Sequence, residues 1–468
     1  MLTRHGRARW VTWAVVLGVV LAGPLSPGTA AARDTRVPAV PGAAAAALLA
    51  CVPGDTLTLG AGVHAGPLLV SRRVLLRGER GAVVAGAGKG TVLEVTAPLA
   101  AIEDLEIRGS GTHVITVDAG IRVRGAGSVV LRRLTLHDVL YGIHAERCPG
   151  IEIADCLLTG RVRPLDELGE GNGVHLWYCE EPRITGCRIE RFMDAVYLSF
   201  TRDALLMRDT IEANGRYGFH TMYCQAGRLI ENRFTHNAAG CAIMFSNHLR
   251  LERNDVLHNR GPRTYGMLLR DCSDGHFEGN RVVDNTVAIF LDNSNRNQLT
   301  GNLFQDNGWG ILMFSSCADN VTAGNAFLNN DYPVALDMKY TRNRFDDGGR
   351  GNYWSENAPF DLDGDGVSDQ PYSPVGTFAF LSKQYPDLAV LSRSPAVAAL
   401  SVAERVLPAL RPSEAVDRFP LVAANFSRER RAAAPVRWPE RRAWPAVAGF
   451  GALAALSVAA LTGARGRA

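Results

Sequence analysis

GFHTMYCQAGRLIENRFTHNAAGCAIMFS, residues 218–246, contains one full period of an internal repeat and the start of the next, and this repeat indicates the fold. Two similar segments, GFHTM from Gly218 and GCAIM from Gly240, lie 22 residues apart. A period of about 22 residues is too short for a two-helix repeat, which needs about 33 or more. It suits one coil of a parallel β-helix, in which short strands are joined by turns and each coil buries its apolar side against its neighbours.

The same pattern, a small residue followed by an apolar run, recurs through the middle of the chain. Most steps are 22 to 24 residues, and the two longer steps contain the insertions RPLDELGEG and RGPRT. Weaker coils such as VLLRG and LEIRG precede the clear ones and alternate apolar with polar residues. A leucine-rich repeat is the rival, but its consensus is missing. The repeats start at Gly142, Gly173, Ala195, Gly218, Gly240, Gly266, Ala288, Gly310 and Val334.

Two columns of asparagine run in step with the repeat. Asparagine tolerates the left-handed backbone of a turn, and stacked side-chain amides can hydrogen-bond from coil to coil. We therefore predict a structural Asn ladder. Its first column is Asn232, Asn254, Asn280, Asn302 and Asn325, and a second column follows each by five residues.

These patterns predict an all-β fold, a right-handed parallel β-helix solenoid with a C-terminal helical extension and a transmembrane helix. The predicted solenoid is residues 56–340, between an N-terminal cap at 33–55 and a C-terminal cap with an Asp-rich loop at 341–390. An amphipathic, partner-docking helix begins at Leu391 and leads into a Pro- and Arg-rich linker, so that residues 391–443 form one region.

Both ends of the chain carry targeting signals. Three arginines, an apolar stretch and a run of small residues predict a signal peptide at residues 1–32, although a membrane anchor is the alternative. The apolar segment 444–464 is flanked by arginines and is long enough to cross a bilayer, although a buried helix is the alternative. We therefore expect a periplasmic protein attached to the inner membrane through its C-terminal segment. The formal net charge of +3 is too small to attract nucleic acid electrostatically, so no nucleic-acid partner is expected.

Histidine and methionine side chains gather on the predicted outward face of the strands. Because side chains alternate along a strand, the second and fourth residues after each small residue face away from the core. Imidazole and thioether groups together select copper, particularly Cu(I). The alternative is that surface histidines bind nothing. The candidate copper ligands are His144, His175, His220, Met222 and Met244.

The cysteines leave two interpretations open. One column alternates Cys with Ser and Thr, which is typical of packed small side chains. However, Cys148 and Cys179 share a column, as do Cys156 and Cys187, and neighbouring coils are close enough for disulfides.

The segment DLDGDGVSD places four aspartates at positions 1, 3, 5 and 9 of a calcium-loop spacing, with Gly366 at position 6. Position 12 is Tyr372 rather than Glu. A bound calcium ion and a plain acidic turn therefore both remain open. The candidate calcium ligands are Asp361, Asp363, Asp365 and Asp369.

The chain resembles the NosD family of periplasmic maturation factors of nitrous oxide reductase, most specifically in GNYWSENAPFDLDGDGVSDQPY, residues 351–372, and in SPAVAAL from Ser394. The resemblance implies a non-enzymatic accessory protein that assists assembly of the reductase's copper–sulfur site. The implied partners are an ABC transporter permease and its ATPase, nitrous oxide reductase, and a lipoprotein copper chaperone. The region after Leu391 resembles the part that docks on the permease.

Two other functions compete with copper-site assembly. Parallel β-helices also serve as polysaccharide lyases, hydrolases and epimerases, which need convergent acid and base groups. The outward positions hold only scattered charges, Glu146, Arg270 and Asp292. The second competitor is a metal-free scaffold that docks a client protein. If the chain is such a scaffold, changing the five His and Met residues would leave reductase maturation intact.

Overall fold

The computed structural model describes residues 32–162, 170–391, 394–407, 413–424 and 426. The predicted signal peptide up to residue 31, and the predicted membrane span at 444–464, lie outside these residues. Within the described part, no helix combines the length and the apolar character that a membrane span needs.

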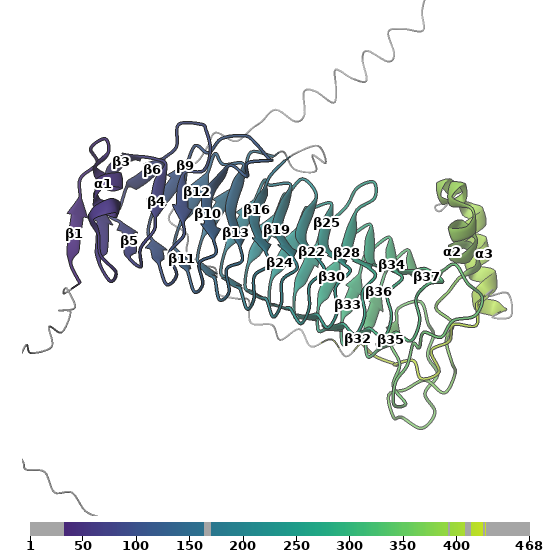
Figure 1. The fold of residues 1–468 in the computed structure, drawn as a ribbon. Helices are drawn as coiled ribbons and strands as arrows, with labels where there is room; N and C mark the ends of the chain where they lie inside the picture. The colour runs from purple at the N-terminus through teal and green to yellow at the C-terminus, as the bar shows by residue number, and fades with distance from the viewer. Residues whose placement is uncertain (1–31, 163–169, 392–393, 408–412, 425, 427–468) are drawn as a thin grey trace, which may run out of the picture. The chain divides into compact units, whose positions relative to one another are not determined.

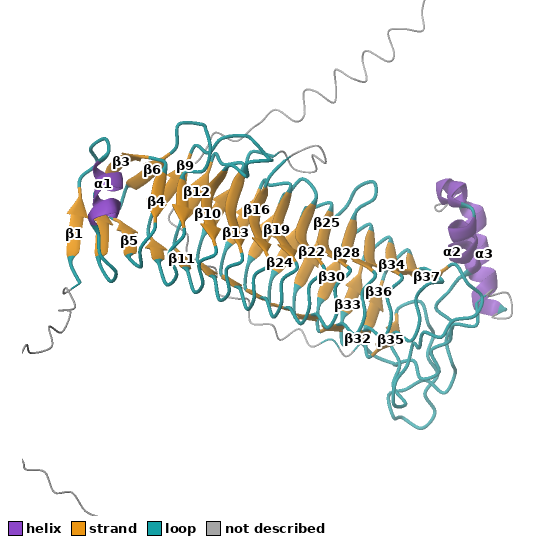
Figure 2. Ribbon diagram, in the orientation of Figure 1, coloured by secondary structure: helices purple, strands orange, loops and turns teal. Residues whose placement is uncertain are grey.

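The fold is a parallel β-helix in which three sheets run side by side along the stack of coils (Figure 1). Every pair of neighbouring strands in these sheets is parallel and comes from consecutive coils. This confirms the predicted all-β solenoid. Figure 2 shows strands in every coil, with the helices confined to the ends.

Sheet A has thirteen strands. They are β1 (Asp34–Val37), β2 (Thr56–Leu59), β5 (Leu75–Gly78), β8 (Ala101–Glu103), β11 (Val130–Arg132), β14 (Glu152–Ala154), β17 (Arg183–Thr185), β20 (Leu205–Met207), β23 (Arg228–Ile230), β26 (Arg250–Glu252), β29 (His276–Glu278), β32 (Gln298–Thr300) and β35 (Val321–Ala323).

Sheet B also has thirteen strands. They are β3 (Gly62–Ala65), β6 (Ala82–Ala85), β9 (Glu106–Arg108), β12 (Thr135–His137), β15 (Leu157–Thr159), β18 (Arg188–Glu190), β21 (Thr210–Glu212), β24 (Arg233–Thr235), β27 (Asp255–Leu257), β30 (Arg281–Val283), β33 (Leu303–Gln305), β36 (Ala326–Leu328) and β38 (Tyr353–Trp354).

Sheet C contains the apolar runs of the repeat and has twelve strands. They are β4 (Leu68–Val70), β7 (Leu93–Val95), β10 (Ala119–Arg124), β13 (Tyr141–Glu146), β16 (Asn172–Trp177), β19 (Asp194–Ser199), β22 (Tyr217–Met222), β25 (Ala239–Met244), β28 (Tyr265–Arg270), β31 (Val287–Asp292), β34 (Trp309–Met313) and β37 (Tyr332–Leu336).

Helices lie at both ends of the stack. Helix α1 (Ala43–Ala50) packs against the first strands, within the predicted N-terminal cap. Helices α2 (Thr377–Gln384) and α3 (Pro395–Val406) lie at the other end, joined by the 3₁₀ segment η1 (Pro386–Leu391). Helix α3 begins four residues later than the helix predicted from Leu391, because Ser394 caps it by accepting a hydrogen bond from Val397 N at 3.3 Å.

The small residue that opens each repeat marks an inner corner of the coil. A Cβ atom on Gly240 would lie 2.7 Å from Gly266 O and 2.7 Å from Val256 Cγ1, so a larger side chain does not fit there. The residue before the small one lies beside the second residue after it, as in the ring contacts of Tyr141 with His144 and of Tyr217 with His220.

The asparagine columns form buried ladders inside the turns. In the first column each Nδ2 donates to the Oδ1 of the next coil's Asn at 2.9–3.0 Å, from Asn232 through Asn254, Asn280, Asn302 and Asn325 to Asn352. The same amides donate to main-chain carbonyls, such as Leu251 O for Asn280. The ladder thereby satisfies polar groups that have no access to water.

Residues 413–422 return to the last coils and close the C-terminal end. Asp417 Oδ2 accepts hydrogen bonds from Asn352 N at 2.7 Å and from Trp354 Nε1 at 2.8 Å. Arg418 forms an ion pair with Asp346. This segment belongs to the predicted helix-and-linker region 391–443, yet it packs against the end of the solenoid next to the predicted C-terminal cap at 341–390.

Candidate functional site

The outward face of sheet C brings the predicted His and Met residues into register. His144 pairs with His175, His175 with Tyr197, and Tyr197 with His220 across consecutive strands. On the same face, Met222 pairs with Met244. Residues 22 to 31 positions apart in the sequence are therefore direct neighbours.

The rings of this face form a continuous stack that Tyr197 divides. The centroids of His144 and His175 lie 4.9 Å apart with an edge-to-face angle of 86°. Tyr197 stacks on His175 at 4.7 Å and on His220 at 4.5 Å. Because the phenol ring lies between two imidazoles, the candidate ligands form two groups. The first is His144 with His175, and the second is His220 with Met222 and Met244.

Three imidazole nitrogens on this face are buried without a hydrogen-bond partner: His144 Nδ1, His175 Nε2 and His220 Nε2. A buried polar atom left without a partner costs about 1–3 kcal/mol. Unpaired ring nitrogens are also what a soft metal ion would bind. The donor set therefore fits copper.

Burial keeps the first group neutral. Loss of solvent, together with the neighbouring His175 and Arg122, lowers the pKa of His144 to about 3. Burial likewise lowers the pKa of His175 to about 4, partly opposed by Asp194. Both imidazoles therefore keep a free lone pair at pH 7.

Asp194 orients His220 and was not among the predicted site residues. His220 Nδ1 lies 2.9 Å from Asp194 Oδ2, and Arg216 binds the same carboxylate through two hydrogen bonds of 2.9 and 2.7 Å. Burial acts to raise the pKa of Asp194, but the hydrogen bonds from His220 and Arg216 outweigh it and hold the pKa below its usual range. A proton on Nδ1 facing the carboxylate leaves the Nε2 lone pair of His220 available as a ligand.

The two thioethers lie on the same face, two residues further along the strands, where Met222 pairs with Met244. Tyr197 Oη donates to Met222 Sδ at 3.4 Å, which fixes the sulfur next to the ring stack. Met244 is half-buried against a small apolar cluster on the same face that includes Ala242 and Phe290. The face thus offers nitrogen and sulfur ligands in a mostly apolar setting.

A ladder of exposed aromatic side chains borders this face. Its members stack at centroid distances of 4.7, 5.0 and 5.1 Å, and each is 38–49% exposed. Each has a φ near +50°, an uncommon conformation for a bulky side chain. They were not among the predicted site residues, because the repeat pattern was followed along the strands and each of these side chains is the first residue after a strand of sheet C. The members are Tyr178, Phe200, Tyr223 and Phe245.

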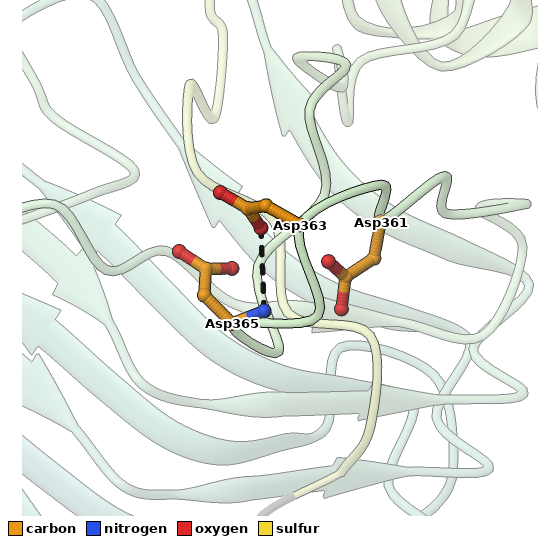
Figure 3. A group of neighbouring side chains, drawn as sticks. All are labelled: Asp361, Asp363 and Asp365. Atoms are coloured by element: carbon orange, nitrogen blue, oxygen red, sulfur yellow. Dashed lines mark hydrogen bonds between the residues drawn. The ribbon is translucent and has the colours of Figure 1, made fainter.

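The acidic loop brings three of its four predicted ligands together. The carboxylates of Asp361, Asp363 and Asp365 lie within 4.8 Å of one another (Figure 3). They also accept hydrogen bonds from the loop's own backbone, for example Gly364 N to Asp361 Oδ1 at 2.7 Å. Asp369 instead accepts from Leu362 N at 2.7 Å and closes the base of the loop. The carboxylates of this acidic turn are thus hydrogen-bonded by the backbone of the same loop, and a bound calcium ion remains a prediction.

Comparison with known proteins gives relatives over most of the chain. Residues 159–358 match the family model described as "Periplasmic copper-binding protein (NosD)". A protein of Pseudomonas aeruginosa named "Probable ABC transporter binding protein NosD" is 31% identical over 390 residues, which cover 78% of this chain and 87% of that protein. A protein of the same name from Stutzerimonas stutzeri is 26% identical over 385 residues, covering 78% and 86%.

Among solved structures, the A-module of a mannuronan C-5 epimerase from Azotobacter vinelandii superposes with a TM-score of 0.51 at 14% identity. The match covers 65% of this chain and 92% of that one. At this identity the likeness concerns the fold alone.

Proposed function

Because the chain belongs to the NosD family of periplasmic copper-binding proteins, we propose that it carries copper as an accessory protein in the maturation of nitrous oxide reductase. In this proposal it assists assembly of the reductase's copper–sulfur site and works with an ABC transporter permease and its ATPase. Copper is its cargo and is supplied by a lipoprotein chaperone. The names of both relatives, which call them ABC transporter binding proteins, support the transporter partner.

The observation that carries the copper proposal is the set of three buried, unpartnered imidazole nitrogens beside two thioethers. Soft sulfur and imidazole ligands favour Cu(I) over hard cations. Tyr197 separates the two groups, so we infer two positions for cargo copper rather than one. His220, oriented by Asp194, would hold the ion at the Met222 and Met244 position.

The side chains at the C-terminal end of the structure favour a role for this end in docking on the permease. Large apolar side chains are unusually exposed there, including Val390 at 89% and Leu362 at 75%. Exposed apolar clusters commonly mark interaction sites. We propose that this end, from the acidic loop to α3, contacts the permease.

The maturation experiment uses a denitrifying host in which this chain replaces the resident protein. The variants are H144A/H175A, H220A and M222L/M244L, and the readout is the copper content and spectrum of the purified reductase. We expect a copper-depleted reductase from each of them. The matched controls are H236A, an exposed histidine in the turn after β24, and M267L, a core methionine.

A metal-free scaffold would give a fully loaded reductase from all three variants, provided that each accumulates to the wild-type level. This result would overturn the copper proposal and leave the docking role intact.

A carbohydrate-active enzyme is the second candidate, because His220, Asp194, Arg216 and Tyr197 join acid, base and cationic groups on one strand face. Against it, Asp194 is fully buried and His220 is only 6% exposed, so a polymer has little access to either. The test incubates the full chain with uronate polymers and follows unsaturated products and epimer content. We expect no turnover, and turnover that H220A abolishes would favour the enzyme.

A further inference from the structure

Four of the nine cysteines form two stacked pairs between the same two coils. Cys148 follows β13 and Cys179 follows β16, whereas Cys156 precedes β15 and Cys187 precedes β18. All four side chains are at most 1% exposed. The two pairs lie on different corners of the coil, so they would join the coils at two separate points.

The backbone fixes both pairs in register. Glu146 is paired with Trp177 just before the first pair, and Gly150 N donates to Glu180 O just after it at 2.8 Å. Parallel neighbours in a sheet lie about 4.8 Å apart, within the range of about 4.4–6.8 Å that Cα atoms of a disulfide span.

The second pair is bracketed in the same way. Ala154 is paired with Thr185 on one side and Leu157 with Arg188 on the other.

The two thiols of each pair occupy neighbouring positions, and Cys148 and Cys156 each donate to a main-chain carbonyl, at 3.1 Å to Glu146 O and at 3.2 Å to Ala154 O. The neighbouring thiols influence each other's ionisation: Cys179 lowers the pKa of Cys148, and Cys148 raises that of Cys179. The neighbouring Cys156, followed by burial, raises the pKa of Cys187.

The other five cysteines have no such neighbour. Cys224 lies between Thr201 and Ser246 in its column, and Cys272 between Ser246 and Ser294. Cys317 stacks on Ser294, Cys241 pairs with Phe219 and Met267, and Cys51 follows helix α1. Stacked cysteines are therefore confined to these two coils, where residues 160–171 interrupt the regular repeat length.

We propose that Cys148–Cys179 and Cys156–Cys187 form disulfides that cross-link the coil before this insertion to the coil after it. The inference rests on export to an oxidising compartment and is independent of the copper proposal. Each pair loses two protons and two electrons to the disulfide of a thiol–disulfide oxidant, which is reduced to its dithiol. One thiolate attacks the oxidant, and the second thiolate then displaces it from the mixed disulfide.

Because all four thiols are buried in the finished solenoid, the bonds form while the two coils are still closing.

The test uses the full chain exported to the periplasm and purified without reductant. The protein is denatured, free thiols are alkylated and counted, and peptides are mapped by mass spectrometry without reduction. We expect five of the nine cysteines alkylated and two cross-linked peptide pairs. Nine alkylated cysteines, or cross-links with other partners, would overturn the proposal.

Two sets of variants test whether the free thiols and the cross-links belong to the cysteines assigned to them. C224S should lower the number of free thiols from five to four and leave both cross-links in place. The double variant C148S/C179S should remove one cross-link while the free count stays at five. A free count that fell to three in the double variant would show that this pair was reduced and would contradict the assignment.

Discussion

Replacing Asp209 with Asn should stabilise the protein, because Asp209 holds a ladder position at which an amide could bond on both sides. Asp209 Oδ1 accepts from Cys187 N at 2.7 Å, but Oδ2 is buried without a partner. One coil later, Asn232 Nδ2 donates to Leu206 O, and the sheet register places Ile184 O at the equivalent point for residue 209. An amide there gains a hydrogen bond of about 0.5–1.5 kcal/mol and removes an unsatisfied oxygen that costs about 1–3 kcal/mol. The expected gain is about 1.5–4.5 kcal/mol.

The gain should depend on pH. Burial, followed by the neighbouring Cys187, raises the pKa of Asp209 well above its ordinary value. The folded chain therefore keeps a proton that the unfolded chain releases above about pH 4, so stability from this group is present at low pH and is lost as pH rises.

D209N lacks this titration. Its advantage in urea unfolding should therefore be larger at pH 7.5 than at pH 4.5, while the reverse change, N232D, should be destabilising. A D209N protein that is less stable than wild type at both pH values would refute this account of the ladder.

Three further substitutions test other contacts. D194N removes the carboxylate that orients His220 and should weaken Cu(I) binding about 10–100-fold in a chelator competition; unchanged affinity would show that Asp194 is not a positioning residue. G351A places a Cβ 1.8 Å from Asp417 Oδ1 and should cost at least about 1–3 kcal/mol in urea unfolding, whereas G127A, with its nearest neighbour at 3.4 Å, should be tolerated. V390D changes an 89% exposed side chain, so stability should shift by at most about 0.5 kcal/mol while co-purification with the permease is lost; retained co-purification would place the docking surface elsewhere.

The repeat length made three features predictable from sequence: the solenoid, the Asn ladder, and which side chains of successive strands are neighbours on the outward face of sheet C. Residues about 22 positions apart had to stack, and His175, Tyr197 and His220 do so. Ring orientation was not predictable, because it depends on packing and hydrogen bonds that the aligned repeat positions do not specify. The sequence analysis therefore did not foresee that Tyr197 separates two ligand groups.

Asp194 was missed for a geometric reason. Strict alternation along the strand assigns the residue before the small one to the core face, but Asp194 instead lies beside His220. A column of outward polar and aromatic residues at this position, Tyr141, Asp194 and Tyr217, was the available signal. The aromatic ladder and the returning segment 413–422 depend on turn conformation and long-range contacts, which the repeat does not encode.

The most direct test of the central claim is an anaerobic Cu(I) titration of the full chain against a chromophoric chelator. Wild type is predicted to withdraw two equivalents of Cu(I), H144A/H175A and H220A/M222L/M244L one equivalent each, and H236A two. Loss of no equivalent from either multiple variant, with wild type still binding copper, would contradict the assignment of the sheet C face as the copper site.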